Sequence, residues 1–72
     1  MSIKYYVQTS LTGKPIWLYK QSVGESSFSE QEWNGTEWKE TSELTGYLIA
    51  GEFHVNKVPM EQAEEMFPAA FA

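Results

Sequence analysis

Alternating apolar and polar positions in the first half of the chain predict β-strands joined by short turns. Four segments rich in aromatic and aliphatic residues are expected to form strands: residues 3–8, 16–20, about 27–33 and 36 to about 40. Turn-forming residues separate them at 10–14 and at 22–26, where Gly24 can adopt a positive φ. Connections this short favour an antiparallel meander.

Helical spacing replaces this alternation after Glu40. Leu44, Tyr47 and Leu48 follow one another at i, i+3 and i+4, which predicts a short helix over about 43–50. Capping residues flank this segment: Thr41 and Ser42 before it and Gly51 after it. The same residues also allow an alternative, in which 47–49 and 52–55 form two further strands.

Residues 52–72 predict one more strand and one more helix. Residues 52–58 alternate apolar Phe53 and Val55 with polar neighbours, the period of a half-buried strand. A helix over 60–67 follows between two prolines, with Phe71 as a final apolar anchor. We therefore expect one α+β domain spanning the 72 residues, β-rich over 3–40 and mixed over 41–72. Its predicted core is a small antiparallel meander of about four strands, with one or two short helices in the C-terminal half packed on one face.

The stretch EQEWNGTEW, residues 30–38, predicts the geometry of one hairpin. An Asn-Gly step is typical of a two-residue type I′ turn, which would place Trp33 opposite Thr36. Successive pairs then alternate between the faces. One face would carry Trp33 and Trp38. The other would be a solvent-exposed face with four charged residues: Glu30, Glu32, Glu37 and Lys39. Phe28 falls on the solvent-exposed face, so either a bulge lies between Phe28 and Gln31 or Phe28 packs outside the area that a helix covers.

Composition narrows the classes of partner. The chain has no cysteine but eleven aromatic residues, so aromatic burial, not disulfides, is expected to stabilise this small core. Ten Glu against five Lys, with no Arg, disfavour direct binding to nucleic acid or to anionic membranes. No segment predicts a signal peptide or a spanning helix, and the absence of cysteine fits a reducing compartment. We therefore expect a cytoplasmic protein.

Few residues suggest catalysis. Glu32 and Glu37 would face each other across the hairpin, yet a solvated hairpin tip has no cleft to exclude water, so a charged solvent-exposed face is favoured. His54 is the only histidine, which disfavours a zinc site and leaves one residue to serve any Ser-His-acid triad. Neither a nucleophile elbow nor a phosphate-binding glycine loop occurs in the chain. We expect no enzyme activity, no metal and no cofactor.

Aromatic residues at both parities of the first two strands give the main functional indication. A small sheet with one covered face would leave some of these rings exposed, and exposed rings are typical interface anchors. The candidate interaction surface comprises four residues: Tyr6, Trp17, Tyr19 and Phe28. The main hypothesis is a protein-interaction or regulatory module that binds a protein partner or a second copy. The alternatives are a small-ligand or carbohydrate-binding module, and a phage-type acidic inhibitor that occupies a nucleic-acid-binding groove of another protein.

Overall fold

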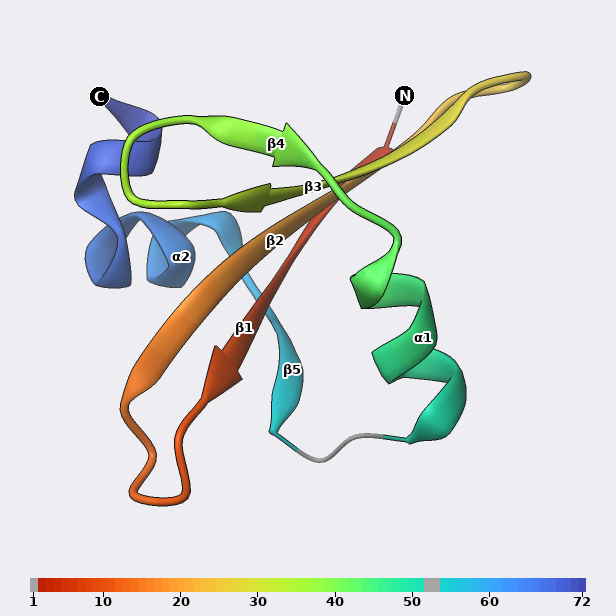
Figure 1. The fold of residues 1–72 in the computed structure, drawn as a ribbon. Helices are drawn as coiled ribbons and strands as arrows, with labels where there is room; N and C mark the ends of the chain where they lie inside the picture. Colours follow the sequence, from red (N-terminus) through yellow and green to blue (C-terminus); the bar gives the residue numbers. More distant parts are fainter. Residues whose placement is uncertain (1, 52–53) are drawn as a thin grey trace.

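The described part of the chain folds as a twisted antiparallel sheet with two helices and a short 3-10 helix (Figure 1). The computed structural model describes residues 2–51 and 54–72. Its strands are β1 (Ser2–Thr9), β2 (Pro15–Val23), β3 (Phe28–Trp33), β4 (Trp38–Glu40) and β5 (Val55–Val58). Its helices are α1 (Glu43–Ala50), α2 (Met60–Met66) and the 3-10 helix η1 (Pro68–Phe71). The strand order is β4-β3-β2-β1-β5, so the predicted α+β class and antiparallel meander are confirmed.

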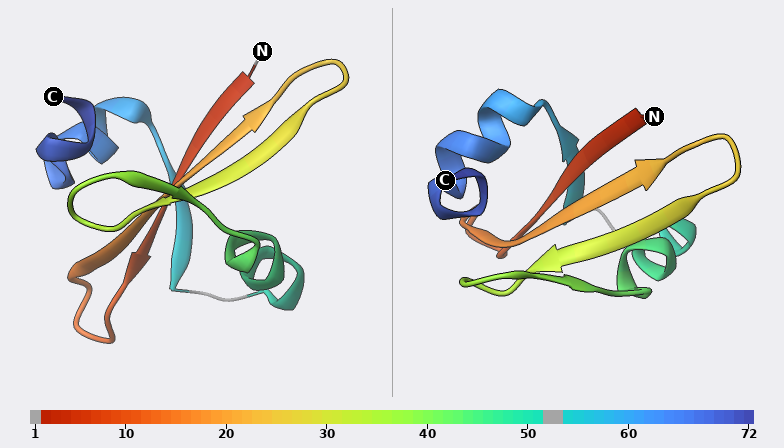
Figure 2. Two further views of the ribbon diagram at one scale, coloured as in Figure 1. Left: turned by 45° about the horizontal axis from the view of Figure 1, so that its top comes forward. Right: turned by 90° about the horizontal axis from the view of Figure 1, so that it is seen from above.

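Two details differ from the sequence-based expectation. The sheet has five strands within the described residues, because β5 pairs with β1 at the edge of the four-stranded meander. The helices lie on opposite faces of the sheet instead of one (Figures 1 and 2). We call these the α1 face and the α2 face. No helix in the described part of the chain is long and apolar enough to cross a membrane.

Coverage on both faces explains why β1 and β2 are apolar at both parities. Val7 and Leu18 are cross-strand partners that pack with Ala63 of α2. The next pair, Tyr6 and Tyr19, faces the other way and packs with α1. Each face therefore has its own small core. The rings that the sequence suggested were left without cover are covered in part by α1.

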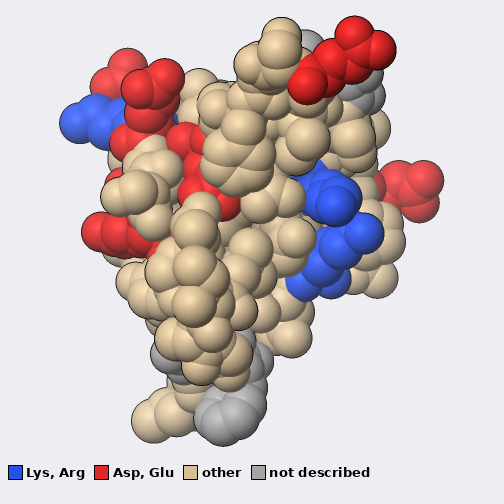
Figure 3. Space-filling model, turned by 90° about the vertical axis from the view of Figure 1, so that its right-hand side faces the viewer, with Lys and Arg blue, Asp and Glu red and all other residues tan. Residues whose placement is uncertain are grey.

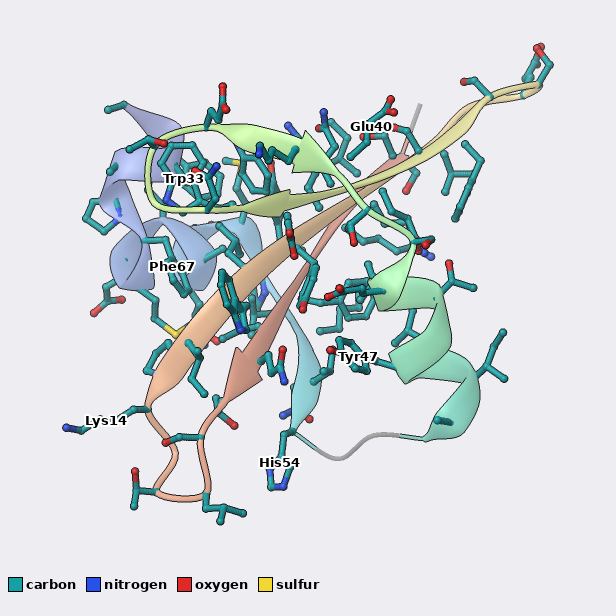
Figure 4. The ribbon with its side chains drawn as sticks, viewed as in Figure 1. Lys14, Trp33, Glu40, Tyr47, His54 and Phe67 are labelled. Carbon is teal, nitrogen blue, oxygen red and sulfur yellow. The ribbon has the colours of Figure 1, made fainter. Side chains whose placement is uncertain are left out.

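The core of the α2 face is mostly aromatic. Trp33 and Trp38 meet edge to face with ring centroids 5.5 Å apart, and Lys20 Nζ lies 4.4 Å from the Trp38 ring centroid. Phe71 returns to pack against Tyr5 with centroids 5.2 Å apart, which confirms its predicted role as an anchor. Figure 4 shows Trp33 and Phe67 on the side of α2 and η1, and Tyr47 on the side of α1.

The β3–β4 hairpin forms where it was predicted, but its turn is different. Trp33 pairs with Trp38, so the connection is a four-residue loop and the predicted type I′ turn is wrong. The Asn34 side-chain oxygen accepts hydrogen bonds from Thr36 N, Thr36 Oγ1 and Glu37 N, each 2.9 Å long. These bonds close the loop around Asn34. Within this loop, only Gly35 takes a positive φ, of 103°.

The hairpin register differs from the prediction by two residues, which preserves the facing of the side chains. Both tryptophans lie on the α2 face, as the pattern predicted. Glu32 lies opposite Lys39 instead of Glu37, which belongs to the loop. The β2–β3 register runs without a break from Leu18 to Val23, so Phe28 shares the parity of Glu30 with no bulge between them.

The second half also follows the predicted elements. Residues 47–50 lie in α1, which rules out the alternative with a strand at 47–49. Gly51 ends α1 in the left-handed conformation with φ 71°, as its position predicted. The expected strand 52–58 is observed as Val55–Val58, while Glu52 and Phe53 lie outside the described residues. The expected helix 60–67 ends one residue earlier, at Met66.

Candidate interaction surface

All four aromatic residues of the predicted surface lie on the α1 face. Tyr6 is the cross-strand partner of Tyr19, and Trp17 has the same parity as Tyr19 on β2. Phe28 pairs with Val23, which is again of that parity. The prediction therefore selected residues of one face, but burial divides them into two groups.

Tyr6 and Tyr19 belong to the core of the α1 face. Tyr19 is 1% exposed and packs with Leu44 and Val55, while Tyr6 is half-buried against the same cluster. The Tyr19 hydroxyl donates a 3.0 Å hydrogen bond to Gln8 Oε1. Burial is the main cause that raises the pKa of Tyr19, with Tyr47, Glu43 and Glu32 adding to it. Tyr19 is therefore a core residue and unsuited to contact a partner.

Trp17 and Phe28 are the exposed members of the set. Trp17 is 41% exposed and Phe28 is 59% exposed. They lie near opposite ends of the sheet, because the partner of Phe28 is Val23, six residues after Trp17 on β2. At about 3.3 Å per residue, some 20 Å separate the two positions. A single small ligand would not span both, whereas a protein surface would.

An open hollow lies beside Phe28, where β3 meets the start of α1. It has a volume of about 400 Å³ and is lined by Phe28, Ser29, Glu30, Glu40, Thr41, Ser42 and Thr45. Glu30 is only 6% exposed, although its position in the hairpin predicts that it lies on a solvent-exposed face. That prediction is wrong for Glu30 because α1 packs over it.

The Glu30 carboxylate serves as an N-terminal cap for α1. Oε1 accepts hydrogen bonds from the backbone N and the side-chain Oγ1 of Thr45, and Oε2 accepts one from Gln21 Nε2 at 3.2 Å. Ser42, at the N-cap position, makes no capping side-chain hydrogen bond, whereas Thr41 Oγ1 accepts one from Glu43 N at 3.1 Å. Glu30 therefore has a structural role that its hairpin pattern did not indicate.

The outward side of α1 adds Ile49, an apolar residue that the sequence analysis did not single out, and Leu48, which the helical spacing placed in one set with Leu44 and Tyr47. Ile49 is 82% exposed and Leu48 is 39% exposed. Gly46 lies between them and the start of the helix, and a Cβ there would meet no described atom within 4 Å. The helical spacing indicates that Ile49 is exposed, because Ile49 falls outside the i, i+3, i+4 set that begins at Leu44.

The residues considered for catalysis are not brought together. Glu32 and Glu37 are no longer cross-strand partners, so the pairing needed for acid-base chemistry is lost. His54 is half-buried and follows the undescribed residues, and its backbone oxygen accepts a hydrogen bond from Thr9 N. Among residues 2–51 and 54–72, no group of three His, Asp or Glu side chains could hold a metal ion.

Carboxylates gather separately on the far side of the sheet. Glu61, Glu64 and Glu65 of α2 line an open hollow of about 420 Å³ together with Pro68, Phe71 and Ala72. Glu32, by contrast, has the parity of Tyr19 and belongs to the α1 face. The glutamates of β3 and those of α2 are thus divided between the two sides of the sheet.

Comparison with known proteins gives no relative. No protein-family model matches the chain, and neither does a curated protein or a solved structure.

Proposed function

We propose that the chain is a non-enzymatic protein-interaction module that binds its partner through the α1 face. The observation that carries this proposal is that four exposed apolar side chains lie on this side of the sheet, with Trp17 and Phe28 near its two ends. Trp17, Phe28, Leu48 and Ile49 belong to the α1 side and are 39% to 82% exposed. Grouped exposed apolar residues on a small soluble domain are typical of binding surfaces.

The chemistry of the exposed rings supports a protein partner. Trp and Phe supply large contact areas, and Trp in particular is enriched among the residues that dominate binding energy. The separation of about 20 Å between Trp17 and Phe28 suits a protein contact area better than a small-molecule pocket. The absence of cysteine is consistent with action in the cytoplasm, which is part of the proposal.

Affinity capture with matched variants tests the proposal. The wild-type chain, Trp17→Ala, Phe28→Ala and the control Leu11→Ala are immobilised and exposed to lysate of the source cells. Leu11 is 91% exposed in the β1–β2 turn, so it controls for loss of an exposed apolar side chain away from α1. We expect a partner that the control retains and that the Trp17 and Phe28 variants lose.

Folding of each variant is checked by circular dichroism before capture. If Trp17→Ala unfolds the chain, the Trp17 ring is core and its part in the surface is wrong. Equal capture by all four proteins would contradict the proposed surface, because binding would then not depend on the α1 face.

A further inference from the structure

The outward side of α1 is an apolar helix surface that no described element covers. Ile49 is 82% exposed on it, and Gly46 and Ala50 are exposed beside it. A Cβ at Gly46 would meet no described atom within 4 Å, so another backbone could approach closely at this point. We call Gly46, Ile49 and Ala50 the α1 ridge.

Opposite charges flank the α1 ridge. On the β1–β5 side, Lys57 pairs with Tyr6, and Lys4 lies two residues before Tyr6 with the same parity, so both lysines belong to the α1 face. We call Lys4 and Lys57 the basic flank. Lys57 is exposed and Lys4 is half-buried.

Glutamates occupy the other side, toward β3 and β4. Glu32 is the cross-strand partner of Tyr19, and Glu43 is in the first turn of α1. Leu44, which follows Glu43, packs against Tyr19, so both glutamates border that ring. We call Glu32 and Glu43 the acidic flank. Figure 3 shows lysine atoms to the right of the uncharged surface and carboxylates mainly to its left, with a further lysine among the left-hand carboxylates and further carboxylates at the upper and far right.

From this arrangement we propose that the partner of the α1 face is a second copy of the chain, related by a two-fold axis that passes through the α1 ridge. The inference rests on the proposed function, since it names the occupant of the same face. In a two-fold dimer the same patch contacts itself, so each contact between unlike residues occurs twice. The axis would bring the acidic flank of each copy against the basic flank of the other.

Charge and area together favour a small, reversible dimer. The basic and acidic flanks are complementary within this one sequence, which a two-fold contact requires. A standard interface buries about 800 Å² of each partner, roughly one sixth of the 4950 Å² accessible surface of this chain. The eight-residue α1 is only about 12 Å long, so the contact is small and depends on its charged flanks, and we expect association that weakens as salt rises.

Sedimentation equilibrium tests the α1 ridge. The wild-type chain is expected to dimerise as its concentration rises, and Ile49→Glu to raise the dimer dissociation constant at least about tenfold. Leu11→Glu introduces the same charge at another exposed apolar residue and is expected to leave the dissociation constant within about twofold. A wild-type chain that stays monomeric at about 1 mM would overturn the proposal.

Mixing two charge-reversal variants tests the two-fold pairing itself. Lys57→Glu places an acid in the basic flank beside Lys4, and Glu43→Lys places a base in the acidic flank beside Glu32, so each variant alone should lose self-association because the changed residue then faces a like charge on the other copy. An equimolar mixture of the two restores both attractive pairs in a heterodimer and should regain wild-type affinity within a few-fold. Failure of the mixture to associate, while the wild type dimerises, would overturn the assigned pairing. If Glu43→Lys disturbs folding, Lys4→Glu tests the basic flank independently.

The outcome also separates this inference from the proposed function. A monomeric wild type combined with a captured protein that depends on Trp17 and Phe28 would overturn the dimer and leave the interaction module in place. A dimer that loses affinity in Ile49→Glu and recovers in the mixture would support the inference even if lysate capture retrieves only the chain itself.

Discussion

Trp33 and Trp38 lie directly opposite each other across the β3–β4 pair, with ring centroids 5.5 Å apart and ring planes at 60°. Trp38 also donates a hydrogen bond from Nε1 to the Ala70 oxygen at 3.4 Å. The pair thus joins the short edge strand β4 both to β3 and to the C-terminal segment. The edge strand β4 is only three residues long, so this contact helps to hold it on the sheet.

A double-mutant cycle measures the ring contact. Trp33→Leu and Trp38→Leu should each lower the free energy of unfolding, since both rings pack on the core of the α2 face. We expect a coupling of about 0.5–1.5 kcal/mol between them, the contribution of an edge-to-face pair beyond burial. Urea unfolding of the four proteins gives the value. Effects that add to within about 0.3 kcal/mol would contradict a direct energetic contact.

Asn34 closes the loop of this hairpin through its side-chain oxygen. Asn34→Ala removes the acceptor of three hydrogen bonds within the exposed loop, and we expect it to lower the free energy of unfolding by about 1 kcal/mol. Asn34→Asp keeps an acceptor oxygen at the same position and serves as the matched control, with a smaller expected loss. Urea unfolding compares them. Equal losses in the two variants would show that the side-chain acceptor does not hold the loop.

The hairpin also shows which features of the fold the sequence predicts. The Asn-Gly step located the reversal correctly, and the period of two sorted the side chains to the right faces. The register differed because the Asn34 side chain supplies hydrogen bonds that a type I′ turn would draw from the backbone. Since the difference is two residues, the facing survived, whereas a difference of one would have exchanged the faces.

The role of Glu30 and the burial of Tyr19 were not predictable in the same way. Both depend on where α1 packs against the sheet, and that depends on tertiary contacts between segments distant in the chain. The sequence does indicate that both faces of the sheet are covered, because β1 and β2 carry apolar residues at both parities. That pattern also predicts exposed rings, which holds for Trp17 but not for Tyr19.

Removal of Glu30 should destabilise α1 more than removal of the residue at its N-cap position. Glu30→Ala leaves Thr45 N, Thr45 Oγ1 and Gln21 Nε2 without their acceptor, and we expect a loss of about 1–3 kcal/mol in the free energy of unfolding. Ser42→Ala is the control, with an expected change below about 0.5 kcal/mol because Ser42 makes no capping side-chain hydrogen bond. Thermal and urea unfolding followed at 222 nm measure both. A larger loss for Ser42→Ala would show that the cap is assigned to the wrong residue.

Two glycines of α1 should respond in opposite directions to alanine. Gly46 is inside the helix, and a methyl group added there would meet no described atom within 4 Å, so Gly46→Ala should raise the free energy of unfolding by up to about 1 kcal/mol. Gly51 has φ 71°, where an L-residue is strained, so Gly51→Ala should lower it by about 1 kcal/mol. Urea unfolding at low protein concentration keeps self-association from contributing. Stabilisation by both substitutions would contradict the left-handed cap at Gly51.

Tyr19 should make the fold sensitive to alkali. Burial raises its pKa above the ordinary value of about 10, so the folded chain keeps a proton that the unfolded chain releases as the pH passes that value. The contribution of Tyr19 to stability is therefore fully present below about pH 10 and is lost progressively as the pH rises beyond it.

Tyr19→Phe provides the comparison. It removes the titrating hydroxyl, together with the hydrogen bond to Gln8 Oε1, and should lower stability at neutral pH while flattening its decline above about pH 10. All other side chains are the same in the two proteins, so the difference between the two curves isolates Tyr19. In the wild type, absorbance at 295 nm should show one of the four tyrosines ionising only as the chain unfolds. Identical alkaline slopes for the two proteins would mean that Tyr19 ionises in the folded state as readily as in the unfolded one, which its burial against Leu44 and Val55 does not allow.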